Sequence, residues 1–87
     1  TINEKADPSV QSDILMALRE AVPDSLSYSH AEGNSPGHIK SSLIGCSAQI
    51  IIESSRLQLG TWQGIFFCEF DGPRNRKCFI TIMPCED

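Results

Sequence analysis

The fold of this chain is organised around DPSVQSDILMALREAVP, the stretch from Asp7 to Pro23. Asp7 directly before Pro8 combines a helix N-cap with a proline suited to the first helical position. Four apolar residues then recur at every fourth position and share one helical face: Val10, Ile14, Leu18 and Val22. Because Pro23 lacks the backbone N–H that a helix needs, the stretch predicts an amphipathic helix over Pro8–Ala21.

The rest of the chain predicts one long loop, a second helix and three strands. Residues 23–35 show no periodicity and are rich in Ser, Asp and Asn, so they form a loop of a length typical of functional loops. Ser35 before Pro36 repeats the cap-and-proline signal, and Gly45 fits a left-handed stop, which predicts a helix over Pro36–Ile44. Segments rich in β-branched and aromatic residues predict the strands: Ala48–Ile52, Leu57–Phe70 and Lys77–Met83.

Length, charge and hydropathy limit the classes of function. Residues 1–87 suffice for a single small domain, and the order of elements predicts an α+β fold with an antiparallel meander. The net charge is −4 and no basic block is longer than Arg74–Lys77, so nucleic acid is not an expected partner. No apolar run approaches the ~20 residues of a membrane span and no signal-peptide pattern opens the chain. We therefore expect no membrane partner and a cytoplasmic location.

The chain ends and the cysteines carry further expectations. Thr1–Asn3 resembles the end of a strand already under way, so we expect a longer parent that has lost its N-terminal part. Three strands and two short helices also give a thin core, so we expect additional strands or a neighbouring subunit to cover the apolar face of the sheet. The cysteines match no zinc spacing: Cys46, Cys68, Cys78 and Cys85. Cys68 and Cys78 could face each other across a hairpin, but without a secretory signal we expect reduced thiols.

Both histidines of the chain lie in or beside the long loop. His30 and Glu32 on the loop, with His38 entering the second helix, provide nitrogen and oxygen ligands that suit zinc or a similar divalent ion. Two histidines do not complete a metal site by themselves. The alternative interpretation makes His30 a solvated loop residue and His38 a residue of a helical first turn.

A phosphate site is a second hypothesis for the same helix. Backbone N–H groups just after Pro36 favour an anion, and His38 and Lys40 add donors nearby. The alternative is that a Ser35 cap satisfies those donors and leaves Lys40 solvated. Further candidates lie outside the loop: Asn3, Glu4, Trp62, Gln63 and Glu69. Trp62 could instead be a core or interface residue and Glu69 a surface residue, whereas Asn3 and Glu4 have no local structural explanation.

Taken together, the motifs of this chain resemble those of the YjbQ family. They run in the family's order along nearly the whole chain: Thr1-Ile2-Asn3-Glu4 with Ala6-Asp7-Pro8, Tyr28-x-His30-x-Glu32-Gly33, Pro36-x-His38-Ile39-Lys40-Ser41-Ser42-Leu43-x-Gly45, Gly60-Thr61-Trp62-Gln63-Gly64-Ile65 and Cys68-Glu69. The His-Ile-Lys and Gly-Thr-Trp-Gln-Gly motifs are the most specific of these. Members of this family are described as secondary thiamine-phosphate synthases.

The resemblance implies a fold, an assembly and a site. It implies an antiparallel β-sandwich with two short helices, assembled as a homotrimer, and a pocket that holds a divalent metal (zinc or magnesium) and a small phosphorylated substrate. By matching motif, three roles follow. The metal ligands are His30, Glu32 and His38; the catalytic residues are His38, Lys40 and Glu69; the substrate-binding residues are Asn3, Glu4, Trp62 and Gln63.

Two departures from the family pattern bear on activity. Family members carry strands and a His-Thr-Ser segment ahead of the position of Thr1, so we expect this chain to lack one histidine of the site and to form a sandwich that is incomplete at its N-terminus. The family loop before Pro36 is usually longer and carries adjacent aspartates, where this chain has only Asn34-Ser35. Two alternatives to the synthase therefore stay open: an inactive member serving as an oligomerising or binding module, and a metal-dependent phosphate-ester hydrolase.

Overall fold

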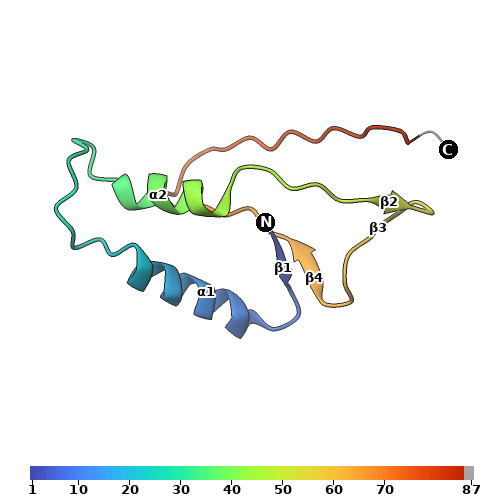
Figure 1. Ribbon diagram of the computed structural model, residues 1–87, viewed down its shortest axis with the longest axis horizontal. Helices are drawn as coiled ribbons and strands as arrows, with labels where there is room; N and C mark the ends of the chain where they lie inside the picture. Colours follow the sequence, from blue (N-terminus) through green and yellow to red (C-terminus); the bar gives the residue numbers. More distant parts are fainter. Residues whose placement is uncertain (86–87) are drawn as a thin grey trace.

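The computed structural model describes residues 1–85 as a mixed α+β chain with two helices and two small antiparallel sheets (Figure 1). Its elements are β1 (Ile2–Glu4), α1 (Pro8–Ala21), α2 (Ser35–Ile44), β2 (Ile52–Glu53), β3 (Arg56–Leu57) and β4 (Gln63–Ile65). Both predicted helices are confirmed, and α2 begins one residue earlier than predicted. Neither helix is long and apolar enough to cross a bilayer in the part of the chain described here.

Helix α1 begins and ends as its sequence predicts. The Asp7 carboxylate accepts hydrogen bonds from the Ser9 backbone N–H at 2.9 Å and the Ser9 hydroxyl at 2.7 Å, which together lower the pKa of Asp7. At the other end, the Val22 N–H donates to the Leu18 carbonyl at 2.9 Å. The Val22 side chain, directly before Pro23, is only 5% exposed.

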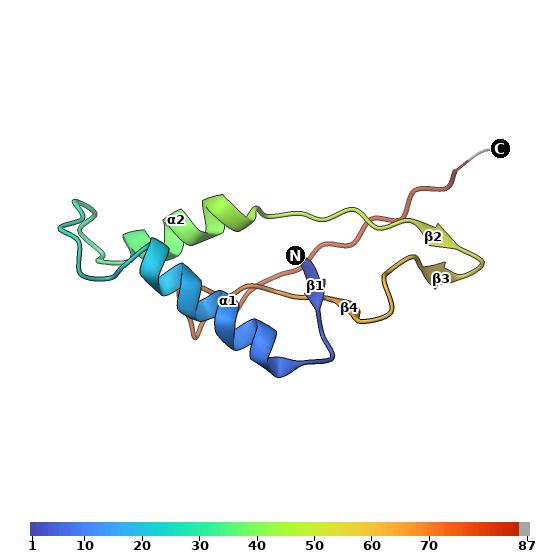
Figure 2. The same ribbon diagram turned by 60° about the horizontal axis from the view of Figure 1, so that its bottom comes forward.

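One sheet pairs strands that are distant in the sequence, and the other pairs strands that are adjacent. Strand β1 pairs antiparallel with β4, and a pair of bonds between Thr1 and Phe66 extends this β1–β4 ladder at one end. Strands β2 and β3 form a local hairpin closed by Ser54 and Ser55, both with positive φ. Figures 1 and 2 show this hairpin projecting at the end of the molecule opposite the long loop.

The predicted strands form only in part. Within residues 1–85, the segment predicted as one strand over Leu57–Phe70 contains only the end of β3 and the three residues of β4. The strand predicted over Lys77–Met83 is wrong for this structure, because the segment is extended but unpaired. The strand predicted over Ala48–Ile52 reduces to its last residue. A strand needs a neighbouring strand to satisfy its backbone, and the described residues do not place one there.

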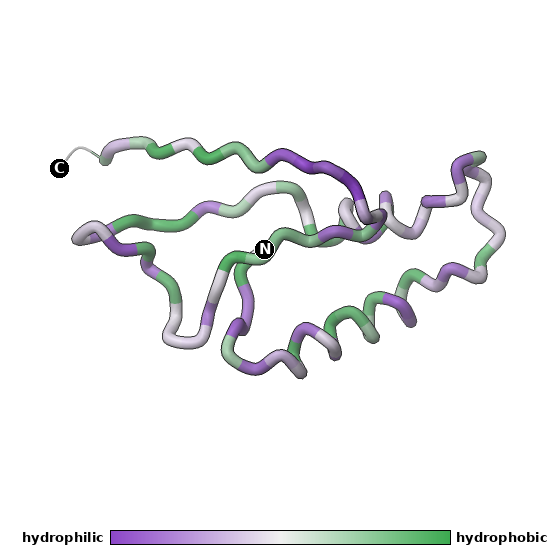
Figure 3. The backbone as a smooth tube through the Cα atoms, turned by 180° about the vertical axis from the view of Figure 1, so that it is seen from behind, coloured by the Kyte–Doolittle hydropathy of each residue, from purple (hydrophilic) through white to green (hydrophobic). Residues whose placement is uncertain are grey.

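The chain is open, with little apolar surface enclosed. Its radius of gyration is 16.1 Å, compared with about 12 Å for a compact domain of this length. The C-terminal segment leaves large apolar side chains uncovered: Phe79 88% exposed, Ile80 83%, Ile82 72% and Met83 78%. In Figure 3 these apolar residues follow a hydrophilic run in the same segment. Residues 1–85 therefore do not cover their own apolar faces.

Candidate functional site

The start of α2 is fixed against the turn that follows Glu69. Pro36 and Gly37 are the buried residues of α2, and a Cβ added at Gly37 would lie 2.9 Å from the Phe70 carbonyl oxygen. The Asn34 amide donates to Asp71 Oδ2 at 2.7 Å, and Arg74 pairs with that same oxygen at 2.9 Å. The glycine permits the close approach and the hydrogen bond holds it, so α2 and the turn are positioned as one unit.

The backbone donors of α2 are largely used within the chain. The N-cap is Asn34, whose side chain makes no capping bond and instead donates from its amide to Asp71. The Gly37 and His38 N–H groups both point to the Asn34 carbonyl, at 3.1 and 3.4 Å. The predicted Ser35 cap is therefore wrong, and the donors proposed for an anion after Pro36 already have an acceptor.

His30 and His38 lie next to each other. Their ring centroids are 5.4 Å apart and the rings meet edge to face at 74°. The loop reaches this position through a turn in which the Gly33 N–H donates to the His30 carbonyl at 3.1 Å, with Gly33 at φ +74°. Both rings are on residues open to solvent. We call these two residues the histidine pair.

The histidine pair contributes two candidate metal ligands. Glu32 is exposed in the turn that carries His30, and among residues 1–85 no three His, Cys, Asp or Glu side chains gather closely enough to hold a metal ion. The four cysteines are free thiols, as expected from the sequence. Structural and catalytic zinc sites use three or four protein ligands, so the described residues fit only part of such a site.

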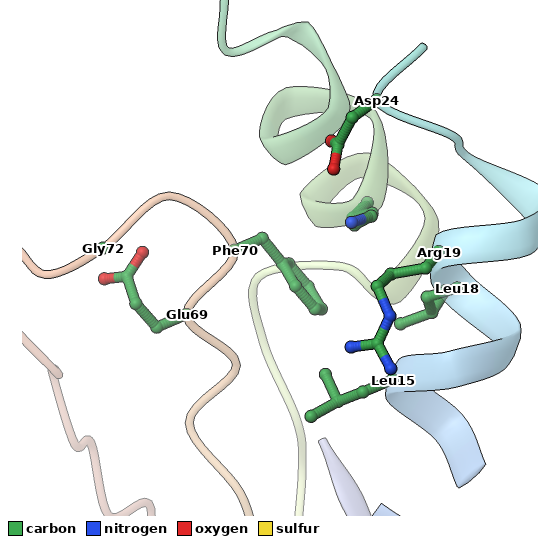
Figure 4. Close-up of a pocket in the computed structure, with 8 residues that line it drawn as sticks. Leu15, Leu18, Arg19, Asp24, Glu69, Phe70 and Gly72 are labelled. Atoms are coloured by element: carbon green, nitrogen blue, oxygen red, sulfur yellow. The ribbon is translucent and has the colours of Figure 1, made fainter. Parts of the chain in front are cut away.

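Lys40 and Glu69 line a hollow between α1, α2 and the turn at residues 69–72 (Figure 4). We call it the α1–α2 hollow, and its volume is about 290 Å³. It is lined by apolar and charged side chains together with one glycine: Leu15, Leu18, Arg19, Asp24, Lys40, Glu69, Phe70 and Gly72. Sequence reasoning named Lys40 and Glu69 but missed Arg19, Asp24 and Phe70, because no spacing or motif marks them.

Glu69 forms an ion pair with Arg76. The Arg76 guanidinium donates to both carboxylate oxygens, at 2.7 and 2.9 Å, and the Asp71 N–H donates at 2.9 Å. These bonds, the Arg76 bond above all, lower the pKa of Glu69 to about 2. Glu69 is therefore an ionised acceptor near neutral pH. A carboxylate of so low a pKa is a weak base for proton transfer.

The four predicted substrate-binding residues meet on the β1–β4 ladder. Glu4 lies opposite Gln63 in the register, and the Lys5 N–H donates to the Trp62 carbonyl at 2.7 Å. The Asn3 side chain accepts a bond from the Glu4 N–H at 2.7 Å. The Gln63 side chain accepts from the Gly60 N–H at 2.8 Å and so closes its own turn. Trp62 is 63% exposed, which leaves its aromatic face open.

The predicted site residues thus fall in three places. The histidine pair with Glu32 lies at the loop, Lys40 and Glu69 line the α1–α2 hollow, and the remaining four lie on the β1–β4 ladder. The helix α2 connects the first two places, because it carries both His38 and Lys40. Within each of these three places the structure brings predicted residues close together, but it does not join the three places into one pocket.

The fold and these clusters define a small α+β protein with titratable side chains gathered around one helix start. Residues 1–85 match the family described as UPF0047 protein YjbQ-like, and the chain belongs to this family. This confirms the resemblance seen in its motifs.

Relatives of known sequence and structure agree. The chain is 57% identical over 83 residues to UPF0047 protein MJ1081 of Methanocaldococcus jannaschii, covering 95% of this chain and 60% of that protein. It is 54% identical over 84 residues to UPF0047 protein YugU of Bacillus subtilis, covering 95% and 64%. The crystal structure of a YjbQ/UPF0047 protein from Clostridium acetobutylicum superposes with a TM-score of 0.82 at 62% identity, covering 85% of this chain and 57% of that one. The conserved hypothetical protein TT1486 from Thermus thermophilus gives 0.80 at 47%, covering 85% and 60%.

The match covers only part of each relative. The chain spans about 60% of the length of these relatives, whose names state no activity. Family membership and fold are therefore established for the chain, whereas the reaction, the metal, the substrate and the assembly are matters for proposal.

Proposed function

We propose that this chain carries part of the active site of a secondary thiamine-phosphate synthase, the activity that its family resemblance implies. In that reaction the ring nitrogen of a thiazole phosphate attacks the methylene of a pyrimidine diphosphate. The new C–N bond forms as the C–O bond to the diphosphate breaks, and pyrophosphate leaves with the electron pair. The observation that carries the proposal is the placement of the histidine pair and Lys40 on and beside one helix, α2.

His30 and His38 are the residues of this chain that would hold a divalent metal, zinc or magnesium, with Glu32 in the same loop. A bound metal would supply Lewis-acid stabilisation of the pyrophosphate leaving group. The remaining ligands belong, in this proposal, to the part of the relatives' length that this chain does not match. The histidine rings, being exposed and adjacent, are free to receive them.

The β-sandwich and the homotrimer implied by the resemblance are part of the same proposal. They find support in the uncovered apolar side chains of the C-terminal segment and of the β2–β3 hairpin, where Ile52 and Leu57 are each 48% exposed. Such faces need a partner surface. Closing the sandwich would also pair the extended segment over Lys77–Met83 with a neighbouring strand.

Two other functions use the same residues. An inactive member that serves as an oligomerising module is favoured by the pairing of Glu69 with Arg76, which leaves one predicted catalytic group engaged elsewhere. A metal-dependent phosphate-ester hydrolase would use the histidine pair in the same way. Product analysis separates the three, since they predict thiamine phosphate, no product and free inorganic phosphate respectively.

The experiment combines elemental analysis with a condensation assay on the full-length protein. We expect the wild-type protein to contain a divalent metal and to form thiamine phosphate, and we expect His38→Ala to lose both. Glu53→Gln changes a residue of the β2–β3 hairpin, which carries neither histidine, and serves as the control. We expect it to retain both the metal and the formation of thiamine phosphate. Unchanged metal content in His38→Ala would remove His38 from the proposed metal site.

A further inference from the structure

The α1–α2 hollow contains two cations that have no partner within the described part of the chain. Arg19 and Lys40 make no ion pair and no side-chain hydrogen bond among residues 1–85, whereas Arg74 pairs with Asp71 and Arg76 with Glu69. Lys40 is half-buried, whereas Arg19 is exposed in the last turn of α1. Two unpaired cations that line one concave surface attract an anion. Arg19 also lies where a cation stabilises the C-terminal end of the α1 dipole, but that role does not explain why it lines the same hollow as Lys40.

The carboxylates of the hollow cancel only part of this charge. Glu69 is neutralised by the two hydrogen bonds from Arg76, and Figure 4 shows its carboxylate turned toward Gly72, away from α1. Asp24 pairs with neither cation within the described part of the chain. Glu69 is engaged by Arg76 outside the hollow, and Asp24 offsets one of the two cations, so the hollow keeps one unit of positive charge.

The remaining lining residues of the hollow are mostly apolar. Leu15 and Leu18 face it from α1, and the Phe70 ring extends toward that helix from the turn (Figure 4). An aromatic ring beside aliphatic side chains offers a surface on which a planar ring can pack. The volume of about 290 Å³ lies just below the roughly 300–1,000 Å³ of ligand sites, which limits a ligand here to one small ring with its phosphate.

We propose that Arg19 and Lys40 form the phosphate-binding pair of this protein and receive an organic phosphate whose ring packs on Phe70. This inference rests on the proposed function, because it assigns a place to the phosphorylated substrate of that reaction. It also follows from the start of α2, where the Gly37 and His38 N–H groups are already directed to the Asn34 carbonyl. With those donors in use, we assign the phosphate to the side-chain cations of the hollow.

The test is calorimetric titration of the full-length protein with inorganic pyrophosphate. We expect Arg19→Gln and Lys40→Gln each to raise Kd about tenfold or more, because each removes a charge-assisted contact to the anion. Arg19→Lys, which keeps the charge but not the planar fork, should lose less. Arg56→Gln, an exposed arginine of β3, is the matched control and should change Kd by less than about twofold.

A second variant tests the role of Glu69 in the charge balance. Arg76→Gln removes a cation that does not line the hollow but frees the Glu69 carboxylate, so pyrophosphate binding should weaken. Equal losses in Arg19→Gln and Arg56→Gln, or no binding by the folded wild-type protein, would overturn the phosphate-binding pair. Binding that depends on Arg19 and Lys40 without any condensation would instead uphold the pair and refute only the proposed reaction.

Discussion

The Asn34 side-chain amide donates to Asp71 Oδ2 at 2.7 Å across 37 residues of sequence, and this bond joins the end of the long loop to the turn after Glu69. Its consequence is geometric. It sets the first turn of α2, which carries His38, beside the segment that carries Glu69 and Phe70. The Oδ1 atom of Asn34 is buried without a partner, so the residue is held through a single side-chain bond.

Removal of this bond should loosen the start of α2. We expect Asn34→Ala to lower the free energy of unfolding of the full-length protein by about 1 kcal/mol, since the lost bond is to a charged but partly exposed acceptor. Asn34→Asp should cost more, because it places a second carboxylate against Asp71. Urea denaturation measures both, and Asn75→Ala in the exposed turn is the control. Equal stability of Asn34→Ala and the wild type would contradict the role assigned to the bond.

The close approach at Gly37 gives a second prediction. Its added Cβ would lie 2.9 Å from the Phe70 carbonyl oxygen and 3.1 Å from the Asp71 Cβ, so backbone must move to accept it. We expect Gly37→Ala to destabilise the protein by about 1–3 kcal/mol, although alanine is the better helix former. Ser41→Ala on the exposed side of the same helix should be neutral or slightly stabilising. Thermal unfolding of the two variants separates local clash from helix propensity, and a stabilised Gly37→Ala would exclude the clash.

Local signals account for the parts of the fold that the sequence predicted correctly. The Asp7–Pro8 start and the apolar face of α1 lie within one segment, so the helix could be identified from its own residues. The β1–β4 ladder could not, because Thr1 and Phe66 are 65 residues apart and no pattern in either segment names the other. The strand expected over Lys77–Met83 has strand composition but no neighbour among residues 1–85, and composition alone does not pair a strand.

The candidate site divides in the same way. The motifs placed His30 and His38 in one candidate site, and the structure puts their rings side by side. Lys40 lies on the same helix as His38 but lines the α1–α2 hollow. Arg19 escaped notice because it is typical of the polar face of an amphipathic helix, and only the folded structure shows that it lines the same hollow as Lys40. The ion pair between Glu69 and Arg76 could not be predicted either, because Arg76 is seven residues away in a segment without regular structure.

The pairing of Glu69 with Arg76 makes stability depend on pH. The pKa of Glu69 is lowered from 4.5 to about 2 in the folded chain, so its contribution is present above pH 4.5 and is lost as the pH falls toward 2. We expect the urea midpoint of the wild type to fall more steeply between about pH 5 and pH 2 than that of Glu69→Gln. Arg76→Gln should show the same shallower slope, and Glu53→Gln on the β2–β3 hairpin should keep the wild-type slope. A wild-type slope in Glu69→Gln would show that the pair does not persist in solution.

The uncovered C-terminal segment leads to a prediction about assembly. Because Phe79, Ile80, Ile82 and Met83 are 72% to 88% exposed in residues 1–85, we expect the full-length protein to bury them against further strands or a second subunit, and to scatter light as a trimer. Ile82→Lys should weaken that assembly by about tenfold or more, since burial of one such side chain contributes roughly 1.5–3 kcal/mol. Gln11→Lys on the solvent-facing side of α1 adds the same charge and should leave the mass unchanged. A stable wild-type monomer would refute the homotrimer and leave additional strands of the same chain as the cover for this segment.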